Sequence, residues 1–148
     1  MKIFLANDHA GFLMKNIIKD FIKNQFPKNE IIDLGTNSEE SVDYPKFGKL
    51  AGQEVIKNPE SKGIIFCGTG IGISIAANKI QGIRAANCSC VTTTKLARQH
   101  NNANILAIGA RIFGPQLIKE MVTTFLETDF LGGRHKKRIE IICTNSTK

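Results

Sequence analysis

A glycine-rich segment directly behind a cysteine carries the clearest chemical signal in this sequence. Cys67 ends an apolar run typical of a strand, and Gly68–Gly72 reads Gly-Thr-Gly-Ile-Gly before a segment typical of a helix. Alternate glycines let the backbone turn its N–H groups inward, and such a nest binds phosphate or an oxyanion that forms during a reaction. The alternative is a turn whose glycines serve only the close packing of strand against helix.

The same segment lacks the common nucleotide-binding patterns. Its third glycine comes one residue too early for G-x-G-x-x-G, and no acidic residue stands about 20 positions further on to bind a ribose. The Gly-Lys-Ser or Gly-Lys-Thr triplet of a P-loop is also missing. These differences argue against a nucleotide-binding or sensory α/β domain.

Cys67 is a candidate catalytic group because it ends a strand and faces a helix N-terminus. The helix dipole and the backbone N–H groups at such a place favour the thiolate. A thiolate serves either as a nucleophile or as a general base. A nucleophile needs a nearby activating histidine, which His9 or His100 could supply. The alternative is an inert cysteine that packs as a small apolar side chain.

The other cysteines show no pattern of a metal site. Cys88 and Cys90 form the only close pair, no second pair stands at zinc-finger spacing, and His100 has no second histidine three to five residues on. We expect Cys88, Cys90 and Cys143 to be small buried apolar residues. The sequence therefore predicts no metal, no cofactor and no disulfide.

The charge is unevenly distributed along the chain. There are 20 Lys and Arg against 13 Asp and Glu, a net charge of +7. The segment Ser61–Lys119 contains seven basic residues and no acidic one, whereas the rest of the chain is balanced. A stretch without carboxylates suits an anionic ligand, because a carboxylate would repel it. The alternative is a chance consequence of a lysine-rich composition.

Nucleic-acid binding is a second interpretation of the basic charge. The sequence pI of about 9.4 and the cluster Arg134–Arg138 favour it. The single Tyr, the absence of Trp and the lack of a known binding motif argue against it. We expect neither a nucleic-acid nor a membrane partner.

Other polar residues stand at the ends of predicted elements. Asp8 and His9 follow the first strand, Arg111 follows the fifth, and His100 and Asn101 end a helical segment. Each has a structural explanation, since Asp caps helices and His favours a helix C-terminus. Together with Cys67 they suggest a single site.

The elements that must position these groups alternate along the chain. The predicted strands span Lys2–Asn7, Glu30–Leu34, Gly63–Cys67, Ile83–Ala86 and Asn104–Gly109. The predicted helices lie within Ala10–Phe26, Phe47–Ile56, the residues after Gly72 up to Asn78, Thr92–Asn101, and the residues from Gly114-Pro115 to Gly132-Gly133. Asn37–Pro45 is predicted to be a loop, and Arg134–Cys143 a last helix or strand.

This alternation predicts an α/β fold with a five-stranded parallel sheet covered by helices on both faces. Ligands of such sheets bind at the carboxyl ends of the strands. The 148 residues suit one domain, 1–148, with a frayed tail at Thr144–Lys148. No apolar run approaches the roughly 20 residues of a membrane-spanning helix, and the first residues show no signal-peptide run. We therefore expect a cytoplasmic protein.

Seven motifs in the chain resemble those of a known family. They are Asn-Asp-His-Ala-Gly at 7–11, Ser-Val-Asp-Tyr-Pro at 41–45, Cys-Gly-Thr-Gly-Ile-Gly-Ile-Ser-Ile-Ala-Ala-Asn-Lys at 67–79, Gly-Ile-Arg-Ala-Ala at 82–86, Ala-Arg-Gln-His-Asn-Asn-Ala-Asn at 97–104, Gly-Ala-Arg at 109–111 and Gly-Gly-Arg-His-Lys-Lys-Arg at 132–138. From Met1 to Ile142 the chain resembles the type B ribose-5-phosphate isomerases, a group that includes galactose-6-phosphate isomerase subunits.

The resemblance implies a Rossmann-like α/β/α sandwich and a metal-independent isomerase of the non-oxidative pentose phosphate pathway. Such an enzyme interconverts ribose 5-phosphate and ribulose 5-phosphate through an enediolate. The resemblance also implies a homodimer or homotetramer whose active sites take residues from the neighbouring chain.

The resemblance assigns roles to individual residues as well. The implied catalytic residues are Cys67, the base that removes the C2 proton, His100, which helps to open the furanose ring, and Thr69. The implied substrate-binding residues are Asp8, His9, Tyr44, Gly68, Gly70, Ile71, Gly72, Asn101, Arg111, Arg134 and Arg138.

A few positions depart from the family pattern. Leu131 and Lys46 stand where an acidic residue is frequent, and Asn102 replaces a common Asp. Ser74 occupies the place of a Glu that some branches carry instead of the cysteine, so the resemblance is to the branch with a cysteine base. A six-carbon substrate, such as allose 6-phosphate or galactose 6-phosphate, stays open as an alternative.

Overall fold

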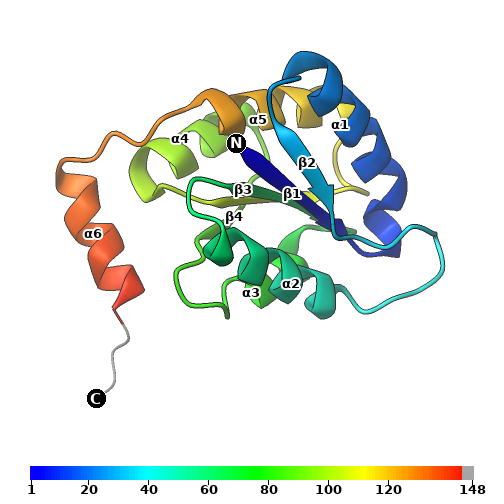
Figure 1. The fold of residues 1–148 in the computed structure, drawn as a ribbon, viewed down its shortest axis with the longest axis horizontal. Helices are drawn as coiled ribbons and strands as arrows, with labels where there is room; N and C mark the ends of the chain where they lie inside the picture. Colours follow the sequence, from blue (N-terminus) through cyan, green and yellow to red (C-terminus); the bar gives the residue numbers. More distant parts are fainter. Residues whose placement is uncertain (145–148) are drawn as a thin grey trace.

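Five parallel strands form one sheet between two layers of helices in the computed structural model, which describes residues 1–144 (Figure 1). The strands are β1 (Lys2–Asn7), β2 (Glu30–Asp33), β3 (Lys62–Cys67), β4 (Ala85–Asn87) and β5 (Ile105–Gly109). Their order across the sheet is β2-β1-β3-β5-β4, and every pairing is parallel. The predicted α/β fold with a five-stranded parallel sheet is confirmed.

Helices follow the strands as the alternation predicts. They are α1 (Phe12–Gln25), α2 (Tyr44–Lys57), α3 (Ile71–Ala77), α4 (Val91–Asn101), α5 (Pro115–Glu127) and α6 (Arg134–Cys143), and a short 3-10 turn, η1 (His9–Gly11), precedes α1. No helix among residues 1–144 combines the length and apolarity that crossing a membrane requires.

Each face of the sheet carries its own apolar core, because side chains alternate between the two faces of a strand. Ile3, Leu5, Ile64 and Phe66 point to one face and pack with the apolar sides of α1, α4 and α5. The intervening residues of β1 and β3 point to the other face and pack with α2 and α3. The sheet is therefore buried on both faces. Its functional groups can lie only where the strands end, the carboxyl edge, or where the strands begin, the amino edge.

Several element boundaries differ from the sequence prediction, among them those of α2, β4 and α5. Helix α2 begins at Tyr44, inside the predicted loop, because Pro45 is well tolerated in a first helical turn. Strand β4 begins at Ala85 because the Arg84 N–H donates to Asn104 Oδ1 (2.8 Å) instead of to a neighbouring strand. Helix α5 ends at Glu127, well before the glycine pair at Gly132.

Two carbonyls of the last turn of α5 are bound by a lysine side chain from β3. Lys62 Nζ donates to the carbonyls of Phe125 (3.2 Å) and Leu126 (2.9 Å). A cation at this place complements the negative end of the helix dipole. The chain then leaves the helix in an extended course toward α6.

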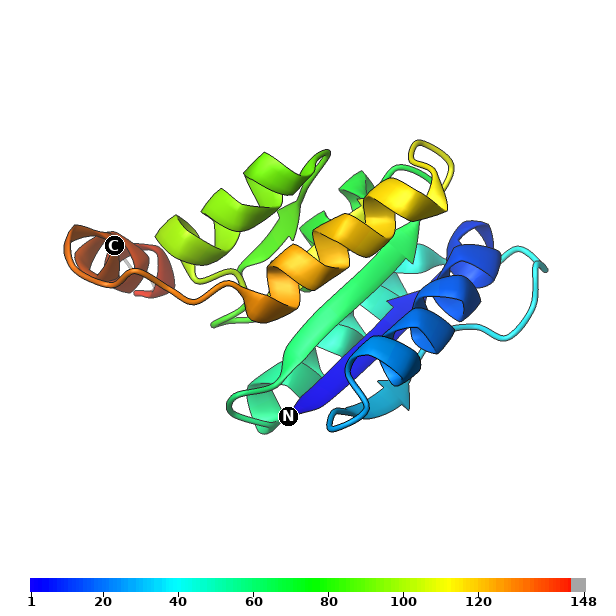
Figure 2. The ribbon, with the colours of Figure 1, turned by 90° about the horizontal axis from the view of Figure 1, so that it is seen from above.

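Helix α6 stands apart from the layers, at the end of the molecule away from the start of α1 (Figures 1 and 2). Most of its residues are exposed, including Ile141 (65% exposed) and Ile142 (62%). Thr144, the first residue of the predicted frayed tail, donates from its N–H to the Glu140 carbonyl (3.0 Å), and residues 145–148 lie outside the described part.

Candidate active site

Cys67 lies at the carboxyl end of β3, in the middle of the sheet. Its side chain is only 4% exposed, and its Sγ accepts a hydrogen bond from the Gly70 N–H (3.1 Å). Strand β3 pairs with β1 on one side and with β5 on the other, so the ends of three strands surround the thiol. The strand that follows β1 in the chain, β2, lies on one side of β1, and the next strand, β3, lies on its other side. Parallel sheets bind their ligands at such a switch in strand order.

The glycine loop after Cys67 is held in a conformation that requires glycine at position 70. Gly70 has φ = 78°, and a Cβ added there would lie 2.5 Å from Asn87 Oδ1 and 2.8 Å from the carbonyl carbon of Ile108. The N–H of Ile71 donates to Thr69 Oγ1 (3.2 Å). Within residues 1–144, the N–H groups of Gly68 and Thr69 donate to no other atom. The loop therefore offers two adjacent open donors beside the thiol, as an oxyanion site requires.

Arg111 lies beside this loop because the end of β5 is fastened to it. The Arg111 N–H donates to the Gly68 carbonyl (3.1 Å), and the Ala110 N–H donates to the Cys67 carbonyl (2.9 Å). A Cβ added to Gly68 would lie 3.6 Å from Arg111 Cδ and 3.8 Å from Arg111 Nη1. An exposed guanidinium thus stands next to the open N–H groups.

Tyr44 contacts the glycine loop from the layer of helices that contains α2 and α3. It is the first residue of α2, and a Cβ added to Gly72 would lie 2.5 Å from Tyr44 Cζ and 2.8 Å from its hydroxyl oxygen. Gly72 therefore makes room for the phenol ring. The ring is 40% exposed, so it forms a rim of the site rather than part of the core.

Asp8 and His9 lie at the end of β1, next to Cys67. Asp8 is 5% exposed, its Oδ1 accepts from the Gly11 N–H (3.2 Å), and its own N–H donates to the Phe66 carbonyl (3.2 Å). Asp8 thus caps the 3-10 turn η1 and not helix α1, whose N-cap is Gly11 and makes no side-chain bond. His9 Nδ1 accepts from the Val42 N–H (3.1 Å), so the ring proton is on Nε2, which can donate to a ligand.

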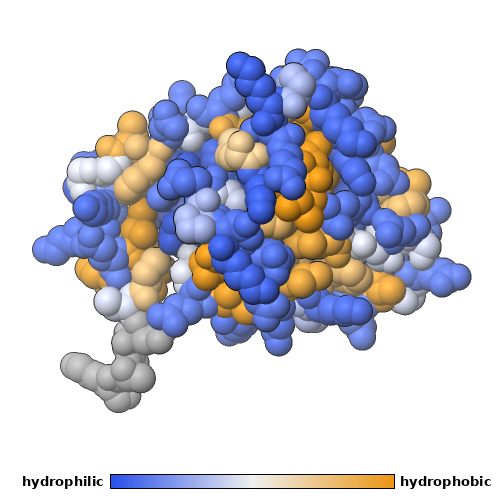
Figure 3. All heavy atoms as spheres, in the orientation of Figure 1, coloured by the Kyte–Doolittle hydropathy of each residue, from blue (hydrophilic) through white to orange (hydrophobic). Residues whose placement is uncertain are grey.

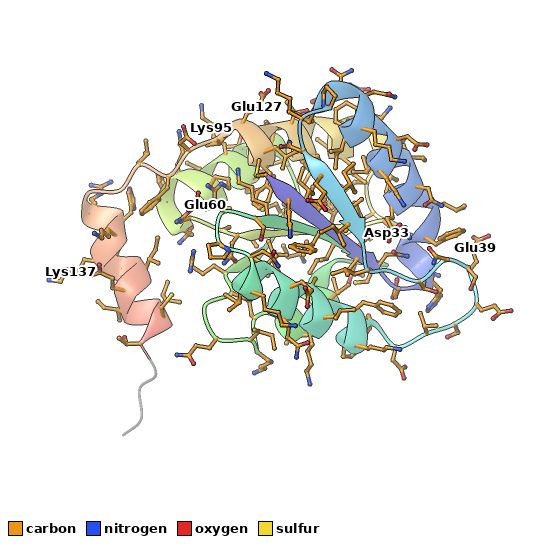
Figure 4. The ribbon with its side chains drawn as sticks, in the orientation of Figure 1. Asp33, Glu39, Glu60, Lys95, Glu127 and Lys137 are labelled. Atoms are coloured by element: carbon orange, nitrogen blue, oxygen red, sulfur yellow. The ribbon has the colours of Figure 1, made fainter. Side chains whose placement is uncertain are left out.

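A buried lysine holds the segment that carries Val42. Lys15 is fully buried in α1, and its Nζ donates to Asp33 Oδ1 (3.0 Å), the Thr36 carbonyl (3.0 Å) and Asn37 Oδ1 (3.4 Å). These bonds fix the chain between β2 and α2 against α1. Figure 4 shows Asp33 at the end of β2, facing the start of α1.

The carboxylate of Asp33 is strongly bound in this arrangement. Burial raises its pKa, but hydrogen bonds from Lys19 (2.8 Å) and Lys15 and from the Gly35 N–H lower it by more, so the pKa of Asp33 is below its ordinary value. Sequence reasoning missed both Lys15 and Val42. A signal for Lys15 existed, because it precedes Ile18 and Ile22 at helical spacing on the buried face of α1.

His100 and Asn101 do not join Cys67 in the same chain. A helix that connects parallel strands runs back across the sheet, so α4 ends at the amino edge, where the Gly63 N–H donates to the Asn104 carbonyl (2.9 Å). The length of β3 and β5 separates this edge from Cys67 by roughly 15 Å. His100 therefore cannot activate Cys67 within one chain.

One residue of α6, His135, contacts His100 at the amino edge. The His100 and His135 rings are stacked, with centroids 4.3 Å apart and 9° between their planes. Burial lowers the pKa of His135, and the charges of His100, Arg134 and Arg138 lower it further. Arg134 and Arg138 are exposed on the same helix. Figure 4 shows Lys137, which lies between them in the sequence, extending from α6 away from the body of the molecule.

The predicted site residues thus form two groups at opposite edges of the sheet. The carboxyl-edge group contains Asp8, His9, Tyr44, Cys67, Gly68, Thr69, Gly70, Ile71, Gly72 and Arg111. The amino-edge group contains His100, Asn101, Arg134 and Arg138. Residues 1–144 hold no cluster of three or more His, Cys, Asp or Glu side chains with the geometry of a metal site.

A buried thiol and an open glycine loop lie at the switch point of a parallel sheet, which is where α/β proteins of this class bind their ligands. A family model described as ribose/galactose isomerase matches residues 3–142. The chain therefore belongs to this isomerase family, as the motifs predict.

Individual relatives match nearly the full length. The ribose-5-phosphate isomerase B of Escherichia coli is 43% identical over 142 residues, which cover 95% of this chain and 93% of that protein. A crystal structure of the enzyme from Thermotoga maritima is 48% identical, with a TM-score of 0.91 over 96% of this chain and 97% of its own. The enzyme from Mycoplasma genitalium, solved with bound ribulose 5-phosphate, is 40% identical, with a TM-score of 0.91 over 96% of this chain and 93% of its own.

Proposed function

We propose that this protein interconverts ribose 5-phosphate and ribulose 5-phosphate, with Cys67 as the general base. The observation that carries the proposal is the thiol beside two open backbone donors at the carboxyl edge of the sheet. The enzymes from Escherichia coli and Mycoplasma genitalium, which are similar over most of this chain, bear the name of this activity, and the second was solved with ribulose 5-phosphate.

The reaction moves one proton between adjacent carbons. Cys67 as thiolate takes the proton from C2 of the open-chain aldose, and the electron pair left on C2 forms the enediolate, with negative charge on the C1 oxygen. The N–H groups of Gly68 and Thr69 stabilise that oxyanion. Protonation of C1 by the Cys67 thiol, together with transfer of the C2 hydroxyl proton to the C1 oxygen, gives the ketose and restores the thiolate. The Gly70 N–H donates to Sγ and so holds the sulfur against the glycine loop.

The phosphate end of the substrate needs cations and donors. Arg111 beside the loop and the Nε2–H of His9 supply them at the carboxyl edge. Arginine suits a phosphate because its fork binds two oxygens at once. Asp8 and Tyr44 border the space between Cys67 and these phosphate-binding groups, and they are the side chains that would contact the sugar hydroxyls.

A complete site needs a second copy of the chain. His100, proposed to open the furanose ring, lies at the amino edge, as do Asn101, Arg134 and Arg138. A two-fold axis that sets two sheets edge to edge and antiparallel would bring the amino edge of one chain to the carboxyl edge of the other. We therefore propose a homodimer with two shared sites, to which each chain contributes one group of residues.

The surface of α6 supports this assembly. On α6, Ile141 (65% exposed) and Ile142 (62%) are unusually exposed for their size, and so is Leu131 (61%) in the segment before this helix. Figure 3 shows apolar side chains gathered along α6, at the end of the molecule that carries the amino-edge group. Apolar surface of this kind marks a protein–protein contact. The occupant that completes both this surface and the site is a second copy.

A six-carbon sugar phosphate is the second candidate substrate, because the family description includes galactose as well as ribose. Kinetics on five- and six-carbon phosphates measured side by side separate the two. A cytoplasmic location is part of the proposal, and the four free thiols suit a reducing compartment.

The test of the proposed function is turnover of ribose 5-phosphate to ribulose 5-phosphate with and without EDTA. We expect turnover that is unchanged by EDTA and specific for the five-carbon substrate. Absence of turnover in the pure protein, or turnover that EDTA abolishes, would contradict the metal-independent pentose isomerase.

A further inference from the structure

The side chain of Arg84 binds the end of α4, which carries His100 and Asn101 of the amino-edge group. Arg84 stands directly before β4, and its Nε donates to the carbonyls of Asn101 (3.0 Å) and Asn102 (3.1 Å). Its Nη2 donates to the Asn102 carbonyl as well (3.0 Å). These are carbonyls at the end of α4, which the helix itself leaves without partners. His100 precedes them directly in the chain.

The same guanidinium also reaches α6. Arg84 Nη1 donates to the Gly82 carbonyl (3.1 Å) and to Cys143 Sγ (3.5 Å), and Cys143 is the last residue of α6. At the other end of α6, His135 stacks on His100. Arg84 is thus a direct side-chain bond between the end of α4 and the helix that carries Arg134 and Arg138.

Arg84 itself is fixed by an asparagine in the chain leading to β5. Asn104 Oδ1 accepts from the Arg84 N–H (2.8 Å), Asn104 Nδ2 donates to the Gly82 carbonyl (3.0 Å), and the Asn104 N–H donates to the Arg84 carbonyl (3.2 Å). The turn from the end of α4 to Asn104 passes through Asn102, which has a left-handed backbone with φ = 43°. The backbone of Arg84 is thus fixed by Asn104, and its guanidinium is fixed by the carbonyls at the end of α4. A side chain held in this way can set the orientation of the residues that it binds.

We propose that Arg84 is a positioning residue of the isomerase, which holds His100 and Asn101 in the geometry they need at the site of the neighbouring chain. The proposal rests on the proposed function and on the ring-opening role of His100. Arg84 lies at the edge away from Cys67, and carbonyls and a sulfur take up most of its donors, so its role is to orient other residues. Arginine is required because its planar fork bonds several carbonyls at once, which the single ammonium group of lysine cannot reproduce.

The test compares two reactions that start from the same open-chain substrate. In D2O, Cys67 removes a proton from C1 of ribulose 5-phosphate, its thiol exchanges with the solvent, and the deuteron then returns to the enediolate either at C1 or at C2. The first path gives deuterated ribulose 5-phosphate and needs no ring chemistry. The second gives open-chain ribose 5-phosphate, whose ring closure is proposed to need His100. The measured quantity is the ratio of deuterium exchange to isomerisation, followed by NMR.

Arg84→Met should raise this ratio by roughly 10- to 100-fold, because displacing a catalytic group by about 1 Å costs up to this factor. Exchange at C1 should continue within about threefold of the unaltered rate. Arg84→Lys, which keeps the charge near the end of α4, should give an intermediate ratio and covers the case that Arg84→Met does not fold. Lys95→Met, at an exposed position on the same helix, is the matched control and should leave the ratio unchanged.

The outcomes separate the two proposals. A folded Arg84→Met with an unchanged ratio, or with exchange and isomerisation reduced in parallel, would overturn the positioning role and leave the isomerase intact. Unaltered protein that neither exchanges nor isomerises ribulose 5-phosphate would overturn the proposed function itself. A raised ratio for Arg84→Met, smaller for Arg84→Lys and absent for Lys95→Met, would establish the role.

Discussion

The two edges of the sheet hold their functional groups in different ways. At the carboxyl edge, Cys67 and Asp8 are the last residue of one strand and the residue after another, and both are buried. At the amino edge, His100 lies at a helix end that a guanidinium and a ring stack hold in place. The sheet itself fixes the first group, whereas the second depends on side-chain bonds and on an exposed helix.

This difference matches the chemistry proposed for each edge. Proton transfer needs a base and oxyanion donors at fixed distances, and strand ends supply such rigidity. In the proposed dimer the amino-edge group reaches the other chain, and two of its members, Arg134 and Arg138, are on the projecting helix α6 with its exposed apolar residues (Figure 1). Changes at the carboxyl edge should therefore affect the chemical step, and changes at the amino edge should affect assembly and ring opening.

The largest effect is expected for Cys67→Ala. Loss of a positioned general base costs about 10²- to 10⁴-fold in turnover, so kcat should fall by about 10³-fold or more. Stability should change little, because the methyl group keeps part of the packing of a small side chain. Kinetics on ribose 5-phosphate and urea unfolding of the same sample are the measurements. A variant that keeps wild-type turnover would remove Cys67 from the mechanism.

Gly70→Ala should damage stability and activity together. The positive φ and the short approaches to Asn87 and Ile108 force the loop to move, and we expect a loss of about 3 kcal/mol in the free energy of unfolding. Gly114→Ala is the matched control, since Gly114 has φ = −75° and nothing lies within 4 Å of its added Cβ. Equal effects of the two substitutions on urea unfolding would contradict the strained loop.

Asp33→Asn should weaken the support of the carboxyl edge by about 2 kcal/mol, since it removes the carboxylate partner of the buried Lys15. The folded-state pKa of Asp33 is lowered, so its contribution is complete above its ordinary pKa of 3.8 and is lost as the pH falls through the lowered value. The stability difference between the two proteins should therefore be constant from pH 5 to 8 and should shrink in acid. Urea unfolding of both proteins, from acid pH up to pH 8, measures this stability difference. A difference that grows in acid would refute the assignment.

The smallest effect is expected at the amino edge, for Lys62→Met. The pKa of Lys62 is lowered from 10.5 to about 8, chiefly by burial. The charge of Arg98 also lowers this pKa, and the charge of Asp129 raises it in part. The unfolded chain therefore binds more protons between these values, and stability should rise with pH across this range relative to the variant, by at most about 2 kcal/mol after solvent screening. Unfolding at pH 7 and pH 10 tests the sign, and a relative loss at pH 10 would show it to be wrong.

The sequence predicted the strands and the carboxyl-edge group well, because both depend on local signals. Apolar runs placed β1 and β3 within one residue, and glycine spacing placed the loop after Cys67. The grouping of His100 with Cys67 in a single site left open how the two residues lie within one chain, and there the structure places them at opposite edges of the sheet. A connecting helix runs opposite to its strands, so α4 ends where the strands begin.

Contacts between distant segments were not predictable in this way. The bond from Val42 to His9 and the bonds from Lys15 to Thr36 and Asn37 depend on how the chain between β2 and α2 folds back on α1. Nothing in the local pattern of that polar segment indicates its path. The role of Arg84 is hidden for the same reason, since its partners follow it by 17 and 18 positions and appear only in the folded chain.

The most direct test of the account is complementation between two inactive chains. Cys67→Ala keeps the amino-edge group, and His100→Ala keeps the carboxyl-edge group. Random assembly of equal amounts makes half of the dimers mixed, each with one intact site, so about a quarter of wild-type activity should return on co-expression. Activity of the mixture no greater than that of the separate variants, with dimers present in both, would contradict a site shared between chains.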